Sequence, residues 1–150
     1  MPLSIIAKLK PALRPQPEAR PQQPARDPEG FVYVKIPESI MPIDRGSKYE
    51  DPLDERLVKA QLGTVTGGGS QLGDPLPDGK RYVVFCGIDI DVADLTKVLP
   101  FLRTELPTLG APVGTELHYT QGGVRLQDEY QSDGWRLAQP RTFLHPGFGI

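Results

Sequence analysis

Cysteine and long apolar runs are both scarce in this chain of 150 residues. A single cysteine, Cys86, excludes an internal disulfide framework. No apolar stretch reaches the ~18 residues of a membrane-spanning helix. The first residues, MPLSIIAKLK, are too short and too charged for a secretory signal peptide. The sequence therefore predicts a soluble, cytoplasmic protein with no membrane partner, which an apolar core stabilises without a metal or a disulfide.

The chain also lacks a surplus of basic charge. Lys and Arg number 17 against 19 Asp and Glu, and the formal net charge is −2. A nucleic-acid-binding protein is expected to carry a basic patch, so no nucleic-acid partner is predicted. No catalytic or cofactor signature stands out either. We therefore expect no cofactor and favour a protein without catalytic activity, while an enzyme remains an alternative.

Residues 82–119 organise the rest of the chain, because they follow the order strand, helix, strand. In 82–92 the side chains alternate between the two faces of a predicted strand. The apolar even positions are Val84, Cys86, Ile88, Ile90 and Val92. The odd positions end with Asp89 and Asp91, so that face meets water or a partner at one end. On the apolar face Cys86 is expected to be a small buried hydrophobic residue and not a reactive thiol.

A leucine stripe after Asp94 predicts an amphipathic helix. Asp94 suits an N-cap, and Gly110 suits the left-handed position beyond a helix end. The stripe consists of Leu95, Val98, Leu99, Leu102, Leu106 and Leu109. Pro100 and Pro107 each remove a helix hydrogen bond. We therefore expect a kink near Pro100 and a helix that ends or loosens before Pro107.

The residues upstream repeat the same order. Residues 31–37 are predicted to form a strand, and 38–50 a long connection of the kind that is more often functional than accidental. Asp51-Pro52 predicts a helix start, and Gly63 the helix end. The expected buried side of this helix consists of Leu53, Leu57 and Ala60, with Val58 as a further candidate.

Three consecutive glycines, Gly67 to Gly69, interrupt the next predicted strand. A phosphate-binding loop would need a lysine and a Ser or Thr at fixed offsets, or a strand before and a helix after it. Neither is present. An edge strand with a bulge is the favoured interpretation.

This order of elements predicts an α+β domain over residues 31–120. The split βαβ, or ferredoxin-like, plan (βαββαβ) has an antiparallel four-stranded sheet in the order 4-1-3-2 with two helices on one face. Residues 121–150 are predicted to add a β-hairpin around 132–134 and an apolar tail that packs on the domain or on a partner. Residues 1–30 are predicted to form a proline-rich flexible arm; a ligand for an aromatic-groove domain is the less favoured interpretation.

The sheet face opposite the helices carries the candidate partner-binding residues. They are Phe31, Tyr33 and Phe85 at the centre, with Asp89, Asp91, Glu116 and His118 around them. Aromatics on two central strands resemble the layout of RNA-recognition motifs. The acidic neighbours would repel phosphate, however, so a protein partner is favoured.

Two further questions arise on this face. Asp89, Asp91 and His118 could together bind a divalent metal, but a solvated acidic strand end is favoured and no metal site is predicted. His145 is expected to pack in an ordered turn. Either the C-terminal segment or a second chain must cover the aromatic surface, and the sequence leaves both open.

Three functions follow from these features. The first is a non-catalytic protein-interaction module, such as an immunity-type protein or an adaptor or assembly subunit, which binds through the open sheet face and the C-terminal tail. The second is a small enzyme or ligand-binding domain with a cleft on that face, formed by dimerisation. The third is homo-oligomerisation through the same face.

Overall fold

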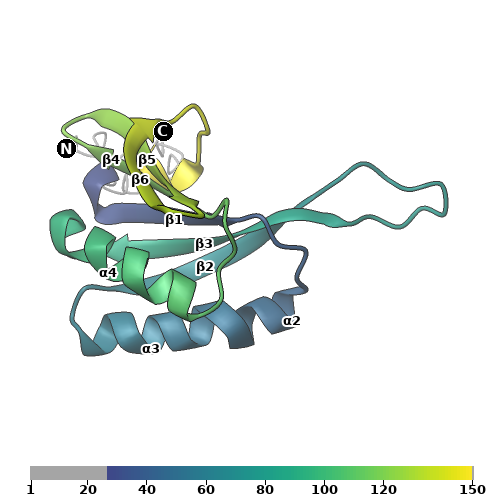
Figure 1. Cartoon of the computed structure of the whole chain (residues 1–150), viewed down its shortest axis with the longest axis horizontal. Helices are drawn as coiled ribbons and strands as arrows, with labels where there is room; N and C mark the ends of the chain where they lie inside the picture. The colour runs from purple at the N-terminus through teal and green to yellow at the C-terminus, as the bar shows by residue number, and fades with distance from the viewer. Residues whose placement is uncertain (1–26, 150) are drawn as a thin grey trace, which may run out of the picture.

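The computed structural model describes residues 27–149, and the prediction of a flexible arm over residues 1–30 lies almost wholly outside them. Six antiparallel strands form one open sheet in the order β2-β3-β1-β4-β5-β6 (Figure 1). The strands are β1 (Phe31–Ile36), β2 (Gly63–Leu72), β3 (Val83–Val92), β4 (Glu116–Gln121), β5 (Val124–Gln131) and β6 (Gly134–Pro140). The helical elements are η1 (Pro28–Gly30), α2 (Pro42–Arg45), η2 (Gly46–Glu50), α3 (Asp51–Lys59), α4 (Leu95–Thr108) and η3 (Pro146–Phe148). Within 27–149 no helix is long and apolar enough to span a membrane.

The predicted α+β class is confirmed, but the sheet has six strands and not the four that we expected. The hairpin β5–β6 turns at 132–133, as predicted, and continues the sheet from the outer edge of β4. Six consecutive residue pairs join β4 to β5, from Glu116 opposite Glu129 to Gln121 opposite Val124. A free strand edge offers a row of unpaired N–H and C=O groups, which the hairpin satisfies.

One face of the sheet packs against α3 and α4 and forms the main core (Figure 1). The alternation in β1, β3 and β4 places every second side chain on this face. The fully buried members include Val32, Val34, Ile36, Cys86, Ile88, Ile90 and Leu117 from the strands and Leu53, Leu57, Val98, Leu102 and Leu106 from the helices. Cys86 is thus a buried core residue, as predicted, and burial raises the pKa of its thiol to about 11.

The helix before β2 is longer than the sequence predicts. Residues 42–50, which we expected to belong to a long loop, are helical and lead directly into α3. Pro42 stands at the first helical position, where its missing N–H costs nothing, and Gly46 adopts ordinary helical angles. The buried Tyr49 explains the extension, because its ring joins the core and its hydroxyl donates a hydrogen bond to Glu38.

The end of α3 also differs from the prediction. We expected Gly63 to end the helix, but the residue with left-handed angles is Gln61, with φ of 58°. Leu62 N–H donates to the carbonyl of Leu57. Gly63 is instead the first residue of β2. Ala60 is exposed and does not belong to the core.

Helix α4 begins as predicted, since Asp94 accepts a hydrogen bond from the N–H of Thr96 at 3.0 Å. Gly110 has the expected positive φ, 98°. The helix does not end before Pro107, however; it continues to Thr108. Pro107 cannot donate to the carbonyl of Arg103, and the indole N–H of Trp135 donates to that carbonyl instead, at 2.9 Å. The hairpin therefore satisfies the group that the proline leaves unpaired.

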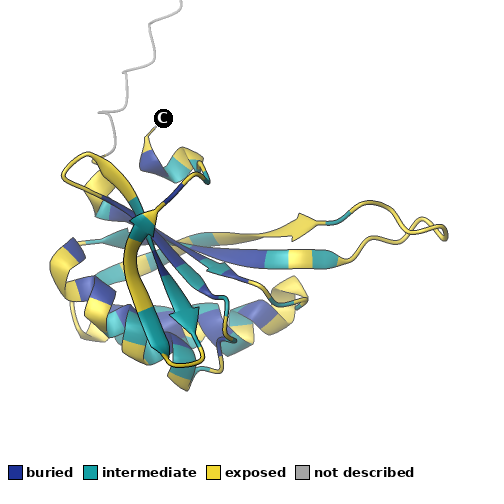
Figure 2. Cartoon of the chain, turned by 45° about the horizontal axis from the view of Figure 1, so that its top comes forward, coloured by how far each residue is buried: buried dark blue, intermediate teal, exposed yellow. Residues whose placement is uncertain are grey.

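Strands β2 and β3 extend beyond the body as a two-stranded ribbon with a long connecting loop (Figure 2). Strand β1 pairs with β3 only as far as Ile36 opposite Cys86. Val84, predicted for the core, lies beyond this point and is 46% exposed. The favoured interpretation of the glycine segment is correct: β2 is an edge strand, with a register shift between Val65 and Gly67.

Candidate binding site

The C-terminal segment after β6, residues 141–149, is called the tail and covers the sheet face opposite the helices. Phe148 packs edge-on against Phe31 at 4.9 Å between centroids, and Phe143 stacks on Tyr33 at 5.6 Å. Phe31 is only 2% exposed and Tyr33 only 7%. The sequence left open whether the tail or a second chain covers this aromatic surface. In the structure the tail covers it.

The seven predicted residues all lie on this tail-covered face. Antiparallel neighbours that stand directly opposite share a face. In the register Tyr33 is opposite both Asp89 and His118, and Phe31 is opposite Asp91. The remaining two, Glu116 and Phe85, follow the same alternation on β4 and β3. Asp89 and His118 therefore lie on either side of Tyr33, one strand away from it each, and not together as a metal site would require.

His145 attaches the tail to the sheet. Its Nε2 lies 3.2 Å from Oδ1 of Asp89, and its Nδ1 accepts a hydrogen bond from Gly147 N–H at 2.9 Å. Since Nδ1 accepts, a neutral ring carries its proton on Nε2, the nitrogen that lies next to Asp89. Both ring nitrogens are thus occupied, and neither can act as a general base. The sequence predicted an ordered turn here but gave no sign of its contact with Asp89.

His118 is fully buried on the same face. Its Nε2 lies 2.8 Å from Oε1 of Glu116, while its Nδ1 is buried without a hydrogen-bond partner among the described residues. Burial lowers the pKa of His118, which favours the neutral ring. The hydrogen bond to His118 lowers the pKa of Glu116, so a neutral imidazole faces a carboxylate.

Tyr33 owes its position to Gly87. The tyrosine ring lies so close to Gly87 that an added Cβ would overlap both the ring and the hydroxyl oxygen. Burial, followed by the charge of Asp89, raises the pKa of Tyr33 to about 12. A glycine in the middle of β3, which weakens a strand, is therefore explained by the aromatic packing above it.

A pocket of about 200 Å³ lies between the tail and β2. Its lining comes from β1, β2, β3 and the tail: Tyr33, Gly68, Gly69, Ser70, Gln71, Phe85, Asp89, Phe143 and His145. Four of the nine lining residues carry aromatic rings, and Asp89 supplies the carboxylate. Lys35 Nζ lies 4.6 Å from the centroid of Phe85, so a cation already occupies one position over that ring.

Two of the consecutive glycines in β2, Gly68 and Gly69, differ in the space around them. An added Cβ at Gly68 would overlap Oε1 of Glu50, which pairs with Arg45 on the helix-covered side. Arg45 in turn donates to Ser70, so this polar cluster joins α2 to β2. At Gly69, by contrast, an added Cβ would meet no atom within 4 Å. The fold requires a glycine at 68 and leaves the space at 69 open, beside the pocket.

The outer edge of β2 is only partly covered. Oδ1 of Asp54, on α3, accepts hydrogen bonds from Val65 N–H and Thr64 Oγ1, both at 2.8 Å. Beyond this point residues 68–72 are exposed, and no strand within 27–149 pairs with them on the outer side. An unpaired edge of this kind is a template for another extended chain.

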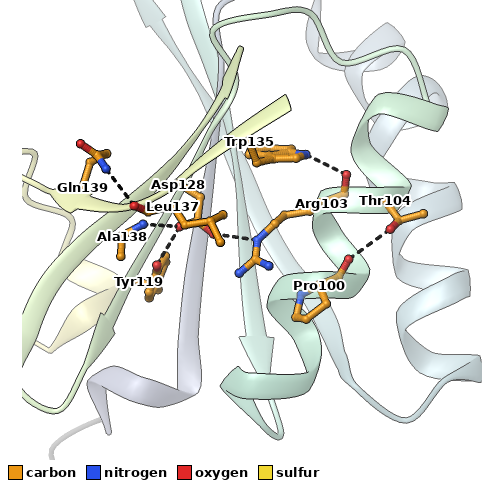
Figure 3. Close-up of polar contacts among 9 residues, drawn as sticks. All are labelled: Pro100, Arg103, Thr104, Tyr119, Asp128, Trp135, Leu137, Ala138 and Gln139. Carbon is orange, nitrogen blue, oxygen red and sulfur yellow. Dashed lines mark hydrogen bonds and ion pairs between the residues drawn. The ribbon is translucent and has the colours of Figure 1, made fainter. Parts of the chain in front are cut away.

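A second polar cluster, on the helix-covered face, was missed from the sequence (Figure 3). Asp128 is fully buried and accepts from Arg103 Nε at 2.9 Å, Tyr119 Oη at 2.7 Å and Ala138 N–H at 2.9 Å. Hydrogen bonding to Asp128, after burial, also raises the pKa of Tyr119. Each carboxylate oxygen is satisfied from within the fold, so the cluster joins α4, β4 and β6 and has no free group for chemistry. The sequence shows only an Asp in an alternating strand.

No group of three or more His, Cys, Asp and Glu side chains within 27–149 is arranged to hold a metal ion. Asp89 instead contacts the tail, and His118 contacts Glu116. Comparisons with protein-family models, with curated proteins and with solved structures find no significant match. The function is therefore inferred from the arrangement of the site alone.

Proposed function

We propose that this protein is a non-catalytic protein-interaction module, of the immunity or adaptor type, that binds an extended segment of a protein partner along the free edge of β2. The observation that carries this proposal is the unpaired edge at 68–72 beside a pocket. Strand addition to a sheet edge gains affinity from main-chain hydrogen bonds and specificity from pockets for alternate side chains.

The chemistry of the pocket favours a basic side chain in the partner. Asp89 carries the negative charge, and the aromatic ring of Tyr33 can attract a cation. Lys35 Nζ already lies 4.6 Å and 5.7 Å from the centroids of Phe85 and Phe143. Of the seven residues predicted as a partner surface, Phe85, Asp89, Asp91 and Glu116 remain partly exposed. The other three are buried beneath the tail and would hold it in place: Phe31, Tyr33 and His118.

An enzymatic function is less well supported by the same geometry. Neither nitrogen of His145 is available as a base, and His118 is buried with its Nε2 against Glu116. The thiol of Cys86 lies in the core with a raised pKa. Proton transfer and nucleophilic attack both need an accessible group, so binding is the simpler function.

The proposal also includes a ferredoxin-like unit and a cytoplasmic location, both of which the sequence predicts. We propose that β1 to β4 with α3 and α4 form a ferredoxin-like unit, supported by their order β2-β3-β1-β4, and that the hairpin and the tail are additions to it. We also retain a cytoplasmic location, for which the sequence features above are the support.

The test uses the full chain as bait in a lysate of the cells that express it. Gly69→Gln fills the open space beside the pocket, and Gly46→Gln, at another site where an added Cβ meets no atom within 4 Å, is the matched control. A stoichiometric partner should bind the wild type and Gly46→Gln and be lost with Gly69→Gln. Asp89→Asn keeps an acceptor for His145 but removes the charge, and should weaken binding.

A second copy of the chain is the competing occupant of this edge. Light scattering after size-exclusion chromatography separates the two: a wild-type dimer that Gly69→Gln converts to a monomer would replace the proposal by self-association. Equal capture of a partner by both glycine variants would place the interface elsewhere.

A further inference from the structure

A buried arginine that has no ion pair with another described residue stands at the start of the tail. Arg141 follows β6 and is only 5% exposed. Its guanidinium donates to the carbonyls of Leu126, Phe143 and Tyr119 and to Oγ1 of Thr120. All four acceptors are neutral. Within the described residues Arg141 forms no ion pair, although buried charges in proteins are usually paired.

The environment of Arg141 makes this charge costly. Burial lowers the pKa of the guanidinium, and the positive charge of Arg125 lowers it further. The ring of Phe148 lies 4.1 Å from the guanidinium carbon and compensates part of the charge. The carboxylate of Glu29 accepts from Gly122 N–H at 3.2 Å and forms no ion pair with either arginine.

Both arginines line a pocket of about 180 Å³. The other lining residues are Pro28, Thr120, Gly123 and Phe148. No residue lines both this pocket and the one beside β2. This second pocket is therefore a separate site, and its chemistry is cationic where that of the first is acidic.

The pocket offers several hydrogen-bond donors. A guanidinium has five N–H groups, and the four hydrogen bonds of Arg141 leave one N–H on Nη1. The oxygen of Thr120 accepts from Arg141, so its own O–H can donate elsewhere. Arg125 is exposed and opposite Thr120 in the strand register, which brings a second guanidinium to the same opening.

We propose that this pocket binds a phosphate group, either as free inorganic phosphate or as the phosphate of a small monoester. A phosphate matches two guanidinium groups in charge and supplies three or more acceptor oxygens. Phe148 and Pro28 form an apolar wall that suits the organic part of a monoester. Binding would supply the anion that the buried Arg141 lacks, and so would stabilise the tail. This site is independent of the proposed protein partner.

Titration by two-dimensional NMR at constant ionic strength tests the proposal, with inorganic phosphate and phenyl phosphate as probes. Saturable shifts are expected at Thr120, Gly123 and the backbone of Gly149. Arg125→Ala should raise the dissociation constant by about tenfold or more, since a hydrogen bond to a charged group contributes that much. Arg81→Ala removes the same charge from the exposed β2–β3 loop and should leave the constant unchanged.

The two probes distinguish the sources of the phosphate. Tighter binding of phenyl phosphate indicates a monoester, and equal or tighter binding of inorganic phosphate indicates the free ion. The proposal is overturned if neither probe saturates, if Arg125→Ala and Arg81→Ala have the same effect, or if benzoate binds more tightly than phenyl phosphate. Arg125 is exposed, so its variant should fold and the result can be interpreted.

Discussion

Nε2 of His145 lies 3.2 Å from Oδ1 of Asp89, and this contact connects the C-terminal tail to the centre of the sheet. The ring of His145 also stacks on Phe31 at 5.2 Å and lies 4.6 Å from the centroid of Tyr33. A single side chain thus combines a polar contact with two aromatic ones. His145 thus contributes to the cover of this face and lines the pocket beside β2.

The first prediction concerns this contact. His145→Ala should lower the free energy of unfolding by about 1–3 kcal/mol, because it removes a hydrogen bond and exposes buried aromatic surface. The released tail should also increase binding of the dye ANS. Leu144→Ala, at a neighbouring position that is 53% exposed, is the control and should change neither. Equal stability and equal dye binding in the two variants would contradict the role of His145.

The second prediction concerns the packing of Tyr33 on Gly87. Gly87→Ala should destabilise the protein by about 1–3 kcal/mol, because the added methyl group forces the ring to move. Gly69→Ala makes the same change at the adjacent edge strand, where the space is open, and should be nearly neutral. Urea unfolding of both variants measures the difference. Similar stabilities would show that the ring adjusts without strain.

The third prediction concerns Asp128. Asp128→Ala should cost about 3–5 kcal/mol, since it leaves Arg103, Tyr119 and the N–H of Ala138 without their partner. Asp128→Asn keeps an acceptor oxygen, so its free energy of unfolding should fall by less. This variant can therefore still be measured in the folded state if the alanine variant unfolds. Glu55→Ala, on the exposed side of α3, is the control and should change stability little. Chemical unfolding should rank the three in this order, and a tolerated Asp128→Ala would show that the cluster is dispensable.

The fourth prediction concerns pH. Burial lowers the pKa of His118 below its ordinary value of 6.5, so below that pH the unfolded chain binds a proton that the folded protein does not. The free energy of unfolding should therefore fall as the pH decreases from 7 to 5, by at most about 1.4 kcal/mol per pH unit for one group. Glu116, whose pKa is lowered by its hydrogen bond with His118, stabilises the fold fully above 4.5 and loses this contribution at lower pH.

His118→Gln provides the comparison for this prediction. Glutamine can still donate to Glu116 but does not titrate, so the variant should show a smaller loss of stability between pH 7 and 5 than the wild type does. Urea unfolding at several pH values gives both curves. Parallel curves would show that His118 does not contribute to the acid sensitivity.

The sequence by itself determined the local elements of this protein. Alternation in residues 83–92, the leucine stripe after Asp94 and the left-handed Gly110 each have a local physical cause, and each was predicted. The same parity placed Phe31 and Tyr33 on the face opposite the helices. Period and capping depend on neighbours within a few positions, so a single chain is enough to show them.

Only the tertiary structure decided what these elements contact. Pro107 remains within α4 because Trp135, far along the chain, donates to the carbonyl of Arg103 that the proline leaves unpaired. Asp89 meets His145, and Asp128 becomes buried, through contacts that no spacing in the sequence indicates. The tail rather than a second chain covers the aromatic face for the same reason. A contact between distant segments depends on how the whole chain packs, and the pattern of either segment alone does not contain it.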